Sequence, residues 1–391
     1  MEDMAGHSRL LTRAQATALA QQLVEAVNAH DVGRLLAMYA EDAITVSPVV
    51  GEISGVSAIG EWWTRIFSLF PDWTVELRDV LVDGERVAFF GTAAATDQNG
   101  WFGLAPTGKR FDYRAIIVLT LAHGKIIRDE RIYDLSGVVE RLEKARLDQE
   151  LMIAAEVQRA LLSRTDHSTP FCEVIGDSVP CRTIGGDFIE SIRLASGGFG
   201  LALGDVAGKG PGSAILAAMI QGMLPVQLES ETDPSATLAH LNESLASKNL
   251  QPRFATLTYA TVSPTGQFTY CNAGHNPPIV ITRDSIRRLS AGGPILGVFR
   301  ESRFEEETIS LAKGDTIVMF SDGLVEARDL QDHEFGEERL ISCLTACRSL
   351  PIGDVLNSIF SSIQRFSEGT PQTDDISMLV ARFTGPQGNG E

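Results

Sequence analysis

Four aspartates set close to glycines are the residues of this sequence best suited to chemistry. Each lies at or near the end of an apolar segment, and three have glycine as a direct neighbour. They are Asp187, Asp205, Asp322 and Asp374. Strand ends in a layered fold converge on one edge, and glycine lets the backbone turn sharply and approach an ion closely. Carboxylates gathered there repel one another unless a cation neutralises them, and oxygen ligands alone favour Mg²⁺ or Mn²⁺ over zinc.

The same residues also admit other interpretations. A single Asp-Gly pair is an ordinary turn signal, so the metal interpretation depends on the four aspartates occurring together. The stretch GDVAGKG at 204–210 contains glycines and a lysine, but it has neither the spacing nor the final Ser or Thr of a phosphate-binding loop. We therefore interpret Lys209 as a solvated lysine, with contact to a substrate phosphate as the alternative.

The length and charge of the chain disfavour several classes of protein. The 391 residues carry 51 Asp and Glu against 33 Lys and Arg, a formal charge of −18. The length predicts two domains, and the acidity disfavours nucleic acid or an anionic membrane as a partner. No apolar stretch approaches the roughly 20 residues of a membrane helix. The polar N-terminus lacks the apolar core of a secretion signal, so we expect a cytoplasmic protein with reduced, mostly buried cysteines.

The elements that position these residues fall into two groups. The N-terminal group has two helices followed by a meander of strands, with Asp83-Gly84 and His123-Gly124 as turn signals. This order predicts an α+β domain that ends near residue 135. The helices are expected at 13–40, with an interruption near His30-Asp31, and at 56–70; the strands are expected at 75–82, 87–96, 111–121 and 126–133.

Residues 136–163 read as one helix. Five of its residues, four of them apolar, step by 4, 3, 4 and 3 residues, which is a heptad seam. The seam consists of Leu147, Leu151, Ala154, Gln158 and Leu161. Periodicity alone leaves two interpretations open, a helix packed on its own domain or a signalling helix that dimerises.

The C-terminal half alternates glycine-punctuated strands with helices. Strands are expected at 199–203, 255–262, 267–272, 316–320 and 376–383, and helices at 212–228, 234–249, 337–347 and 352–367. The last six residues, 386–391, are expected to be disordered.

This half resembles the metal-dependent protein phosphatases of the PPM (protein phosphatase 2C) type. It is most similar to the branch of bacterial stress and sporulation regulators that includes RsbU and SpoIIE. The resemblance spans roughly residues 148–384. It rests on IGGDF at 184–188, GDVAGKG at 204–210, FATLTYATVSPTGQFTYCNAGHNPP at 254–278, GDTIVMFSDGLVEARD at 314–329 and DDISMLV at 374–380. It implies an α-β-β-α sandwich over residues 165–385.

The resemblance also assigns ligands for two divalent cations, Mn²⁺ or Mg²⁺. It implies that Asp205 bridges both ions and that the Val206 carbonyl joins the one on the Asp187 side. It implies that Asp322 and Asp374 hold the other ion. The implied reaction is hydrolysis of phosphoserine or phosphothreonine by a water molecule that the two metals activate.

Four residues in or near these motifs depart from the family pattern or have less certain roles. Asp375 stands where many relatives have Asn, and Ile189-Glu190 replace a common Tyr-Asp. His275 lies in a recurrent turn motif of the family, which favours a structural or gating role over acid catalysis.

Residues 12–135 resemble the SnoaL-like, nuclear-transport-factor-2-like cone, a curved antiparallel sheet with helices. The resemblance rests on HDVGRLLAMYAEDA at 30–43, GEISGVSAIGEWW at 51–63 and IIRDERIYD at 126–134. It implies an apolar pocket, which five aromatic residues either line or simply fill as core. They are Trp62, Trp63, Trp73, Tyr113 and Tyr133. Some relatives are small-molecule enzymes with an acid–base dyad, for which Asp42, Asp112, Arg114 and Arg131 are available.

Together these resemblances predict a sensory domain at 10–135, a helical linker at 136–164 and a phosphatase domain at 165–385. The expected substrate is a phosphorylated anti-sigma-factor antagonist of the STAS type, and the expected assembly is a homodimer with a small ligand in the cone. Two alternatives remain. One is a catalytically silent docking module, and the other is isomerase or hydrolase activity in the cone.

Overall fold

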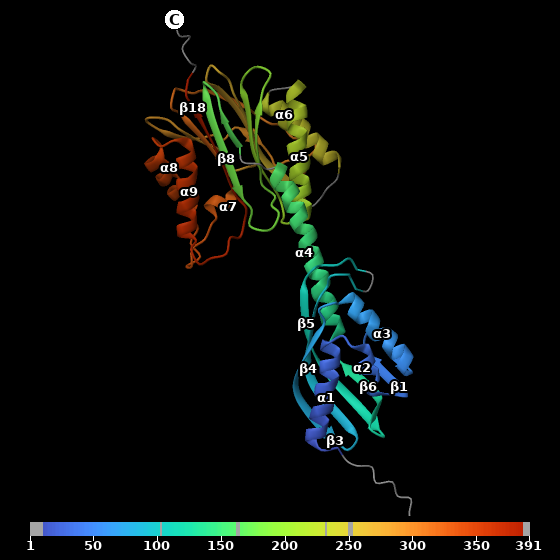
Figure 1. Cartoon of the computed structure of the whole chain (residues 1–391). Helices are drawn as coiled ribbons and strands as arrows, with labels where there is room; N and C mark the ends of the chain where they lie inside the picture. Colours follow the sequence, from blue (N-terminus) through green and yellow to red (C-terminus); the bar gives the residue numbers. More distant parts are fainter. Residues whose placement is uncertain (1–10, 102–103, 162–164, 231–232, 249–252, 386–391) are drawn as a thin grey trace, which may run out of the picture. The chain divides into compact units, whose positions relative to one another are not determined.

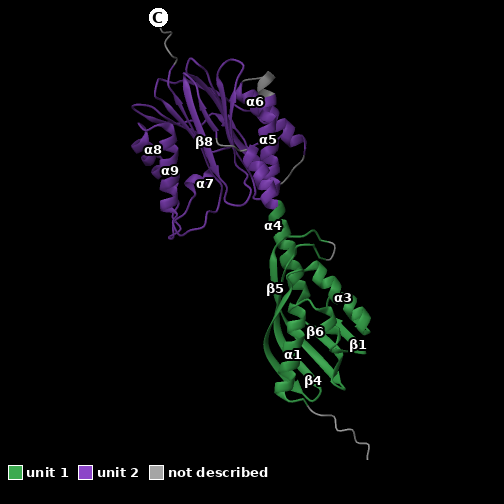
Figure 2. Ribbon diagram, in the orientation of Figure 1, with its two compact units in different colours: residues 1–150 green, residues 151–391 purple. Residues whose placement is uncertain are grey.

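The structure is a computed structural model that describes residues 11–101, 104–161, 165–230, 233–248 and 253–385 (Figure 1). The chain divides into two compact units, residues 1–150 and 151–391 (Figure 2). The division falls inside helix α4 (Leu135–Leu161), which therefore contributes residues to both units. The boundaries 10–135, 136–164 and 165–385 stay predictions, and the tail at 386–391 lies outside the described residues.

Unit 1 is built on one six-stranded sheet in the order β2-β1-β6-β5-β4-β3. Neighbouring strands are antiparallel except β1 and β6, which are parallel. Its elements are α1 (Arg13–Asn28), α2 (Val32–Leu36), β1 (Tyr39–Ser47), β2 (Gly51–Ser54), α3 (Val56–Leu69), β3 (Thr74–Asp83), β4 (Arg86–Thr96), β5 (Arg110–Ala122) and β6 (Lys125–Ile132).

The two predicted hairpins are present in this sheet. Gly84 takes a positive φ of 64° in the loop between β3 and β4, and His123 and Gly124 both take positive φ between β5 and β6. A two-residue loop with two positive φ angles matches the twist of the strands it joins. Along β4 every second residue is buried, so one face of the sheet packs with α1 and α3 around Trp63 and Phe89.

The helix predicted over 13–40 is wrong at its C-terminal end. Thr12 caps the start of α1 in a capping box with Gln15. The helical conformation is interrupted at His30, which has a φ of 52°. The second piece, α2, ends at Leu36, and Tyr39 already belongs to β1. Helical spacing continues through these residues, but pairing of β1 with β2 and β6 overrides that local preference.

Unit 2 is a four-layer sandwich of two sheets between two helical layers. The sheet orders are β15-β12-β11-β10-β9, with β16 on β12, and β14-β13-β17-β18-β8-β7. Its elements are β7 (Thr165–Ser168), β8 (Cys172–Val179), β9 (Phe188–Arg193), β10 (Phe199–Val206), α5 (Pro211–Ser230), α6 (Pro234–Ser247), β11 (Ala255–Val262), β12 (Gln267–Ala273), β13 (Ile279–Ile281), β14 (Ile286–Arg288), β15 (Gly292–Gly293), β16 (Glu307–Ser310), β17 (Thr316–Phe320), α7 (Asp322–Val325), α8 (Gly336–Cys347), α9 (Ile352–Phe366) and β18 (Ile376–Phe383).

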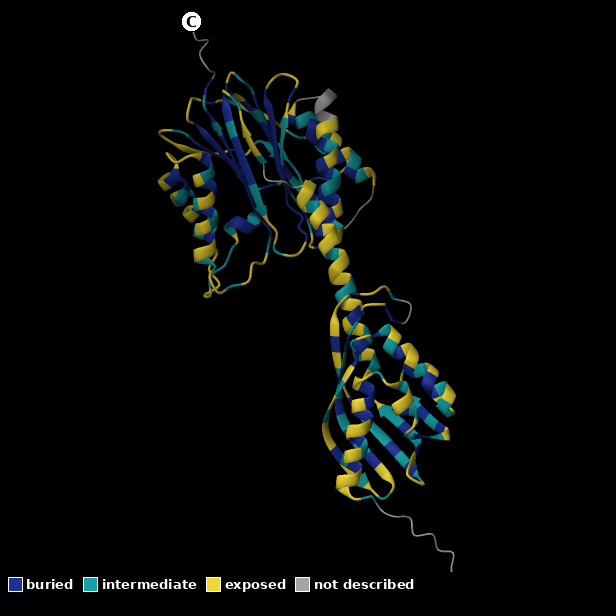
Figure 3. Cartoon of the chain, viewed as in Figure 1, coloured by how far each residue is buried: buried dark blue, intermediate teal, exposed yellow. Residues whose placement is uncertain are grey.

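Three hydrophobic clusters hold these layers together. The one between the sheets includes Leu201, Phe268 and Leu379. A second joins α5 and α6 to the first sheet, and a third joins α8 and α9 to the second sheet. The strands are accordingly buried, whereas the helices expose their outer faces (Figure 3). Within the described residues, every helix is too short or too polar to cross a membrane.

Candidate metal centre

The four predicted aspartates, here called the acid cluster (Asp187, Asp205, Asp322 and Asp374), come from both sheets of unit 2. Asp187 immediately precedes β9, and Asp205 is the penultimate residue of β10. One residue separates Asp322, which opens α7, from the end of β17, and one residue separates Asp374 from the start of β18. Each sheet therefore contributes two carboxylates, and every one of them is placed by the end of a strand.

The charges of the acid cluster act on one another. Burial raises the pKa of Asp205 to about 6, and the neighbouring charges of Asp322 and Asp374 add to that effect. Burial and then the charge of Asp205 raise the pKa of Asp187, while burial and then Asp374 raise that of Asp322. These raised pKa values mean that nearby positive charge is insufficient to stabilise the ionised carboxylates. A divalent cation would supply that charge.

The space around Asp187 and Asp205 fits such a cation. The Oδ2 atom of Asp187 is buried and has no hydrogen-bond partner among the described residues. A Cβ atom added to Gly186 would lie 2.7 Å from the Val206 carbonyl oxygen and 3.2 Å from Asp205 Oδ1. The two oxygens thus face one small space that only glycine leaves open. Oxygen donors of this kind match Mg²⁺ or Mn²⁺.

The tightest group of ligand atoms was not the predicted one. Atoms of Cys181, Asp374 and Asp375 lie within 4.8 Å of one another, and no three members of the acid cluster come as close in the part of the chain that the structure describes. Cys181 was not singled out from the sequence. Burial raises the pKa of its thiol to about 11, and the charge of Asp375 contributes. The thiol is therefore protonated near neutral pH and a weak nucleophile.

Asp375 anchors the loop that carries Asp187. Its Oδ1 accepts the backbone N–H of Cys181 at 2.8 Å, and its Oδ2 accepts that of Gly186 at 2.7 Å. The side chain is buried, and a Cβ on Gly185 would lie 2.4 Å from Oδ2. The sequence analysis assigned Asp374 to a metal ion and left the role of Asp375 open; in the fold Asp375 is buried and Asp374 remains partly exposed.

Lys209 is not a freely solvated lysine. Its Nζ lies 2.9 Å from Asp374 Oδ2 and also donates to the carbonyl oxygen of Thr373. This contact corrects the interpretation drawn from the sequence. The ammonium group of Lys209 thus forms an ion pair with Asp374, a carboxylate that the resemblance assigns to a metal ion.

His275 has the surroundings of a structural residue. Its backbone N–H donates to Asn272 Oδ1 at 2.7 Å, and its Nδ1 lies 2.8 Å from the Thr256 hydroxyl. The imidazole is buried, and burial lowers its pKa to about 4. A ring that is neutral at physiological pH is poorly suited to act as a cationic general acid, and the structural or gating role of His275 stays a prediction.

Helix α4 contacts the loop of Asp187 directly. Leu151 and Ala155 pack with Ile184 and Ala214. The Gln158 amide bonds to the backbone of Gly185, two residues before Asp187. The heptad seam is therefore split, because Leu151 and Gln158 face unit 2. Other apolar residues of the helix are exposed: Leu147, Met152, Ile153, Val157 and Leu161.

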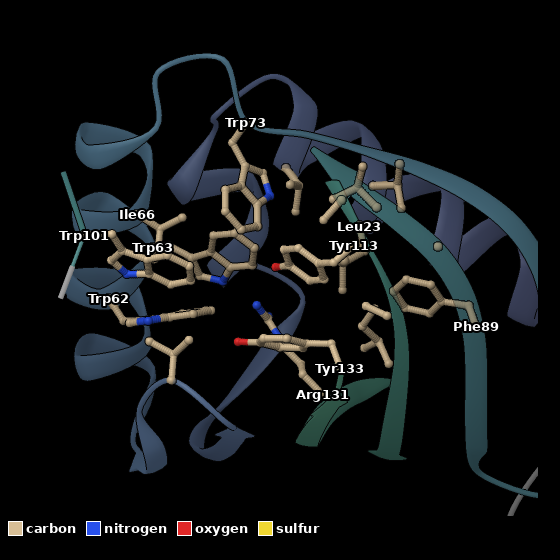
Figure 4. Close-up of a pocket in the computed structure, with 18 residues that line it drawn as sticks. Leu23, Trp62, Trp63, Ile66, Trp73, Phe89, Trp101, Tyr113, Arg131 and Tyr133 are labelled. Carbon is tan, nitrogen blue, oxygen red and sulfur yellow. The ribbon is translucent and has the colours of Figure 1, made fainter. Parts of the chain in front are cut away.

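In unit 1 the predicted dyad candidates do not meet. Asp42, Asp112 and Arg114 are exposed. Arg131 instead pairs with the buried Asp129, with Nη2 2.6 Å from Oδ2. Tyr39 donates its hydroxyl to the same carboxylate at 2.6 Å. The five aromatic residues named from the sequence do line one cavity, together with Arg131 (Figure 4).

Comparison with known proteins identifies both units. Residues 195–384 match the family Stage II sporulation protein E (SpoIIE), and residues 20–129 match the SnoaL-like domain. Over 273 residues the chain is 31% identical to the phosphoserine phosphatase RsbU of Bacillus subtilis (strain 168), covering 68% of this chain and 78% of RsbU. The chain belongs to the SpoIIE family of metal-dependent protein phosphatases.

Two further comparisons concern this SpoIIE-type phosphatase. It is 26% identical over 231 residues to Protein IcfG of Synechocystis sp. (strain ATCC 27184 / PCC 6803 / Kazusa), covering 51% of this chain and only 36% of IcfG. The SiaA-PP2C domain of Pseudomonas aeruginosa superimposes with a TM-score of 0.55 at 19% identity, covering 62% of this chain and 98% of that domain. These likenesses confirm the predicted sandwich of unit 2, and the SnoaL-like match confirms the predicted fold of unit 1.

Proposed function

We propose that the acid cluster is the active site of a serine/threonine phosphatase that takes two Mn²⁺ or Mg²⁺ ions. Asp187, Asp205 and the Val206 carbonyl would hold one ion, and Asp205, Asp322 and Asp374 the other. The observation that carries this proposal is the pair of oxygens, from Val206 and Asp205, that face the space left open by Gly186. Two such ions would lower the pKa of a water molecule and polarise the phosphoryl group.

The protein groups around the site have supporting tasks. Asp375 fixes the loop of Asp187 through its two backbone hydrogen bonds. Burial and neighbouring charges raise the pKa values of Asp187 and Asp205, so a bound cation would stabilise the ionised forms of both carboxylates. A protein nucleophile is not required, and the protonated Cys181 is a poor one. A groove of about 410 Å³ lined by Gly323, Phe360 and Asp374 adjoins the site and has room for the residues that flank a phosphoserine.

The proposed substrate is a phosphorylated anti-sigma-factor antagonist of the STAS type. The 31% identity to a protein named phosphoserine phosphatase RsbU supports a phosphoserine in a protein as the target. The test is release of phosphate from a phosphorylated STAS protein in the presence of Mn²⁺, with the same protein phosphorylated on tyrosine as the control. Binding of the phosphoprotein without any turnover would instead favour the silent docking module.

The proposed regulation runs through α4. It contacts Ile184 and Gly185 in the loop that carries Asp187, and its exposed residues Ile153, Val157 and Leu161 form a stripe suited to a second copy of the chain. Ligand or partner binding to the cone would shift α4 and reposition Asp187 relative to Asp205. If removal of residues 1–135 left the phosphatase rate, the metal affinity and the oligomeric state unchanged, this mechanism would be wrong.

A further inference from the structure

The groove beside Asp374 lies on the helical side of the second sheet of unit 2. It is bordered by α7, α9, the end of β8 and the start of β18 (Figure 1). Its volume of about 410 Å³ falls within the roughly 300–1,000 Å³ of typical binding pockets. Asp374 of the acid cluster lines it, and so does Gly323, which follows Asp322. The groove therefore adjoins the proposed active site.

Apolar side chains line much of this groove and remain partly uncovered. They are Val179, Ala327, Phe360, Ile363, Pro371 and Ile376. Val179 is 43% exposed although it ends a strand, and Phe360 is only partly buried on α9. Exposed apolar surface gathered in one place marks a binding site more often than a free surface.

Leu330 extends this apolar surface at the rim of the groove. Its side chain is 71% exposed, and a Cβ atom added to Gly369 would lie 3.4 Å from its Cδ2. Gly369 stands between Ser367 and Thr370, which both line the groove. Because hydrophobic stabilisation follows the area removed from water, a side chain this exposed contributes little to folding and is available to a partner.

Hydrogen bonds hold the wall of the groove that leads to the acid cluster. The Nε2 atom of Gln372 donates to the carbonyl oxygen of Val179 at 2.8 Å and to that of Asp374 at 2.7 Å. These bonds tie the segment before β18 to the end of β8. A wall that is already ordered lowers the entropy cost of binding.

The charges around the groove favour an uncharged occupant. Among the described residues that line it, Arg328 is the one cation. Its guanidinium pairs with Asp332 at 2.9 Å and with Glu334 at 2.6 Å, and Asp177 adds a negative charge to the lining. An acidic residue of a substrate would find its countercharge already in use, so an apolar side chain is the better match.

We propose that this groove binds an apolar side chain located one or two residues from the phosphoserine of the substrate protein. An extended chain advances roughly 3.3–3.6 Å per residue, so such a neighbour stays close to a phosphate held at the acid cluster. Val179, Phe360 and Leu330 would cover its side chain. This inference rests on the phosphatase proposal and deepens it by naming a feature that the site recognises in its substrate.

The first experiment measures hydrolysis of three synthetic phosphoserine peptides by the full-length protein with Mn²⁺. The peptides differ only in the two residues on each side of the phosphoserine, which are all leucine, all asparagine or all lysine. The leucine peptide should have a kcat/KM at least fivefold above that of the other two. Equal values, a preference for lysine, or turnover of para-nitrophenyl phosphate without hydrolysis of any peptide would overturn the proposal. No turnover of any of these substrates would refute the phosphatase proposal itself.

The second experiment follows the ratio of kcat/KM between the leucine and asparagine peptides, in which a general change in catalysis cancels. Phe360→Ser should lower the ratio below twofold. Leu330→Ser should at least halve it, and because Leu330 is so exposed this variant tests the groove even if Phe360→Ser destabilises the fold. Phe299→Ser is the matched control, since Phe299 is 59% exposed and lies outside the groove lining. A ratio that persists in both groove variants, or that falls equally in the control, would overturn the proposal.

Discussion

The side-chain amide of Gln158 bonds to both polar groups of one peptide residue, Gly185. Its Nε2 donates to the Gly185 carbonyl oxygen at 2.8 Å, and its Oε1 accepts the Gly185 N–H at 3.1 Å. Gly185 lies two residues before Asp187, so a residue of α4 holds the loop that carries a predicted metal ligand. Through this contact, a movement of α4 would change the position of the Asp187 loop in the acid cluster.

Substitution Gln158→Leu is expected to weaken Mn²⁺ binding and to lower kcat/KM by about tenfold. Leucine has a similar size but leaves two backbone groups of Gly185 without partners, which costs about 1–3 kcal/mol in loop stability. The control is Gln149→Leu, because Gln149 lies on the same helix but bonds to the Thr107 carbonyl in unit 1. Mn²⁺ titration of both variants measures the difference; equal affinities would contradict the coupling.

Substitution Asp375→Ala is expected to lower the free energy of unfolding by about 1–3 kcal/mol for each buried N–H that loses its acceptor. The two donors concerned belong to Cys181 and Gly186. Urea unfolding of the metal-free protein measures the effect without any contribution from metal ligands. A variant as stable as the original chain would show that these two bonds do not anchor the loop.

The stability of the metal-free protein is expected to fall as the pH rises from about 4 to above 6. The folded-state pKa of Asp205 is about 6 against an ordinary value of 3.8. The folded state therefore binds more protons between these values, and its advantage is complete below pH 3.8 and lost above pH 6. The shift corresponds to up to about 3 kcal/mol.

Thermal melts in EDTA, compared between the original chain and Asp205→Asn, measure this pH dependence. The asparagine variant should lose less stability than the original chain between pH 4 and 7, and saturating Mn²⁺ should flatten the original profile. Identical pH profiles for both proteins would show that Asp205 is not a source of the dependence.

Substitution Lys209→Met is expected to tighten Mn²⁺ binding a few-fold. The Lys209 ammonium lies 2.9 Å from Asp374 Oδ2, where it competes with a divalent cation for the same carboxylate. Lys313→Met serves as the control, because Lys313 lies by Gly314 at the far end of β18 from Asp374. Weaker binding after Lys209→Met would mean that the lysine positions Asp374 instead of competing for it.

Strand ends were predictable from the sequence because glycines and apolar runs mark them locally. The strands at 255–262, 316–320 and 376–383 have the predicted bounds, and they help to place the acid cluster. Local sequence patterns could not predict which strands pair with one another. The strand β1 was missed because its formation depends on β6, which lies about 80 residues later in the chain.

The same limit explains why the sequence did not reveal the roles of Asp375 and Arg131 and did not single out Asp129. The contacts that separate Asp374 from Asp375 come from distant parts of the chain: Asp374 pairs with Lys209, whereas Asp375 accepts the backbone N–H groups of Cys181 and Gly186. Asp129 and Arg131 lie two residues apart on β6, a spacing that places both on one face of a strand. Two charged residues at that spacing beside buried Ile126 could have signalled an inward ion pair. A register shift at Leu121 obscured it, because the shift changes the alternation along the strand.

The most direct test of the metal-centre assignment is hydrolysis of para-nitrophenyl phosphate by the full-length protein, measured with Mn²⁺ and with EDTA. Asp205→Asn is the test variant, and Asp166→Asn, an exposed aspartate of β7, is the matched control. The account predicts Mn²⁺-dependent turnover that EDTA abolishes, a loss of at least a hundredfold in Asp205→Asn, and an unchanged rate in Asp166→Asn. Turnover that persists in EDTA, or that survives Asp205→Asn, would contradict it.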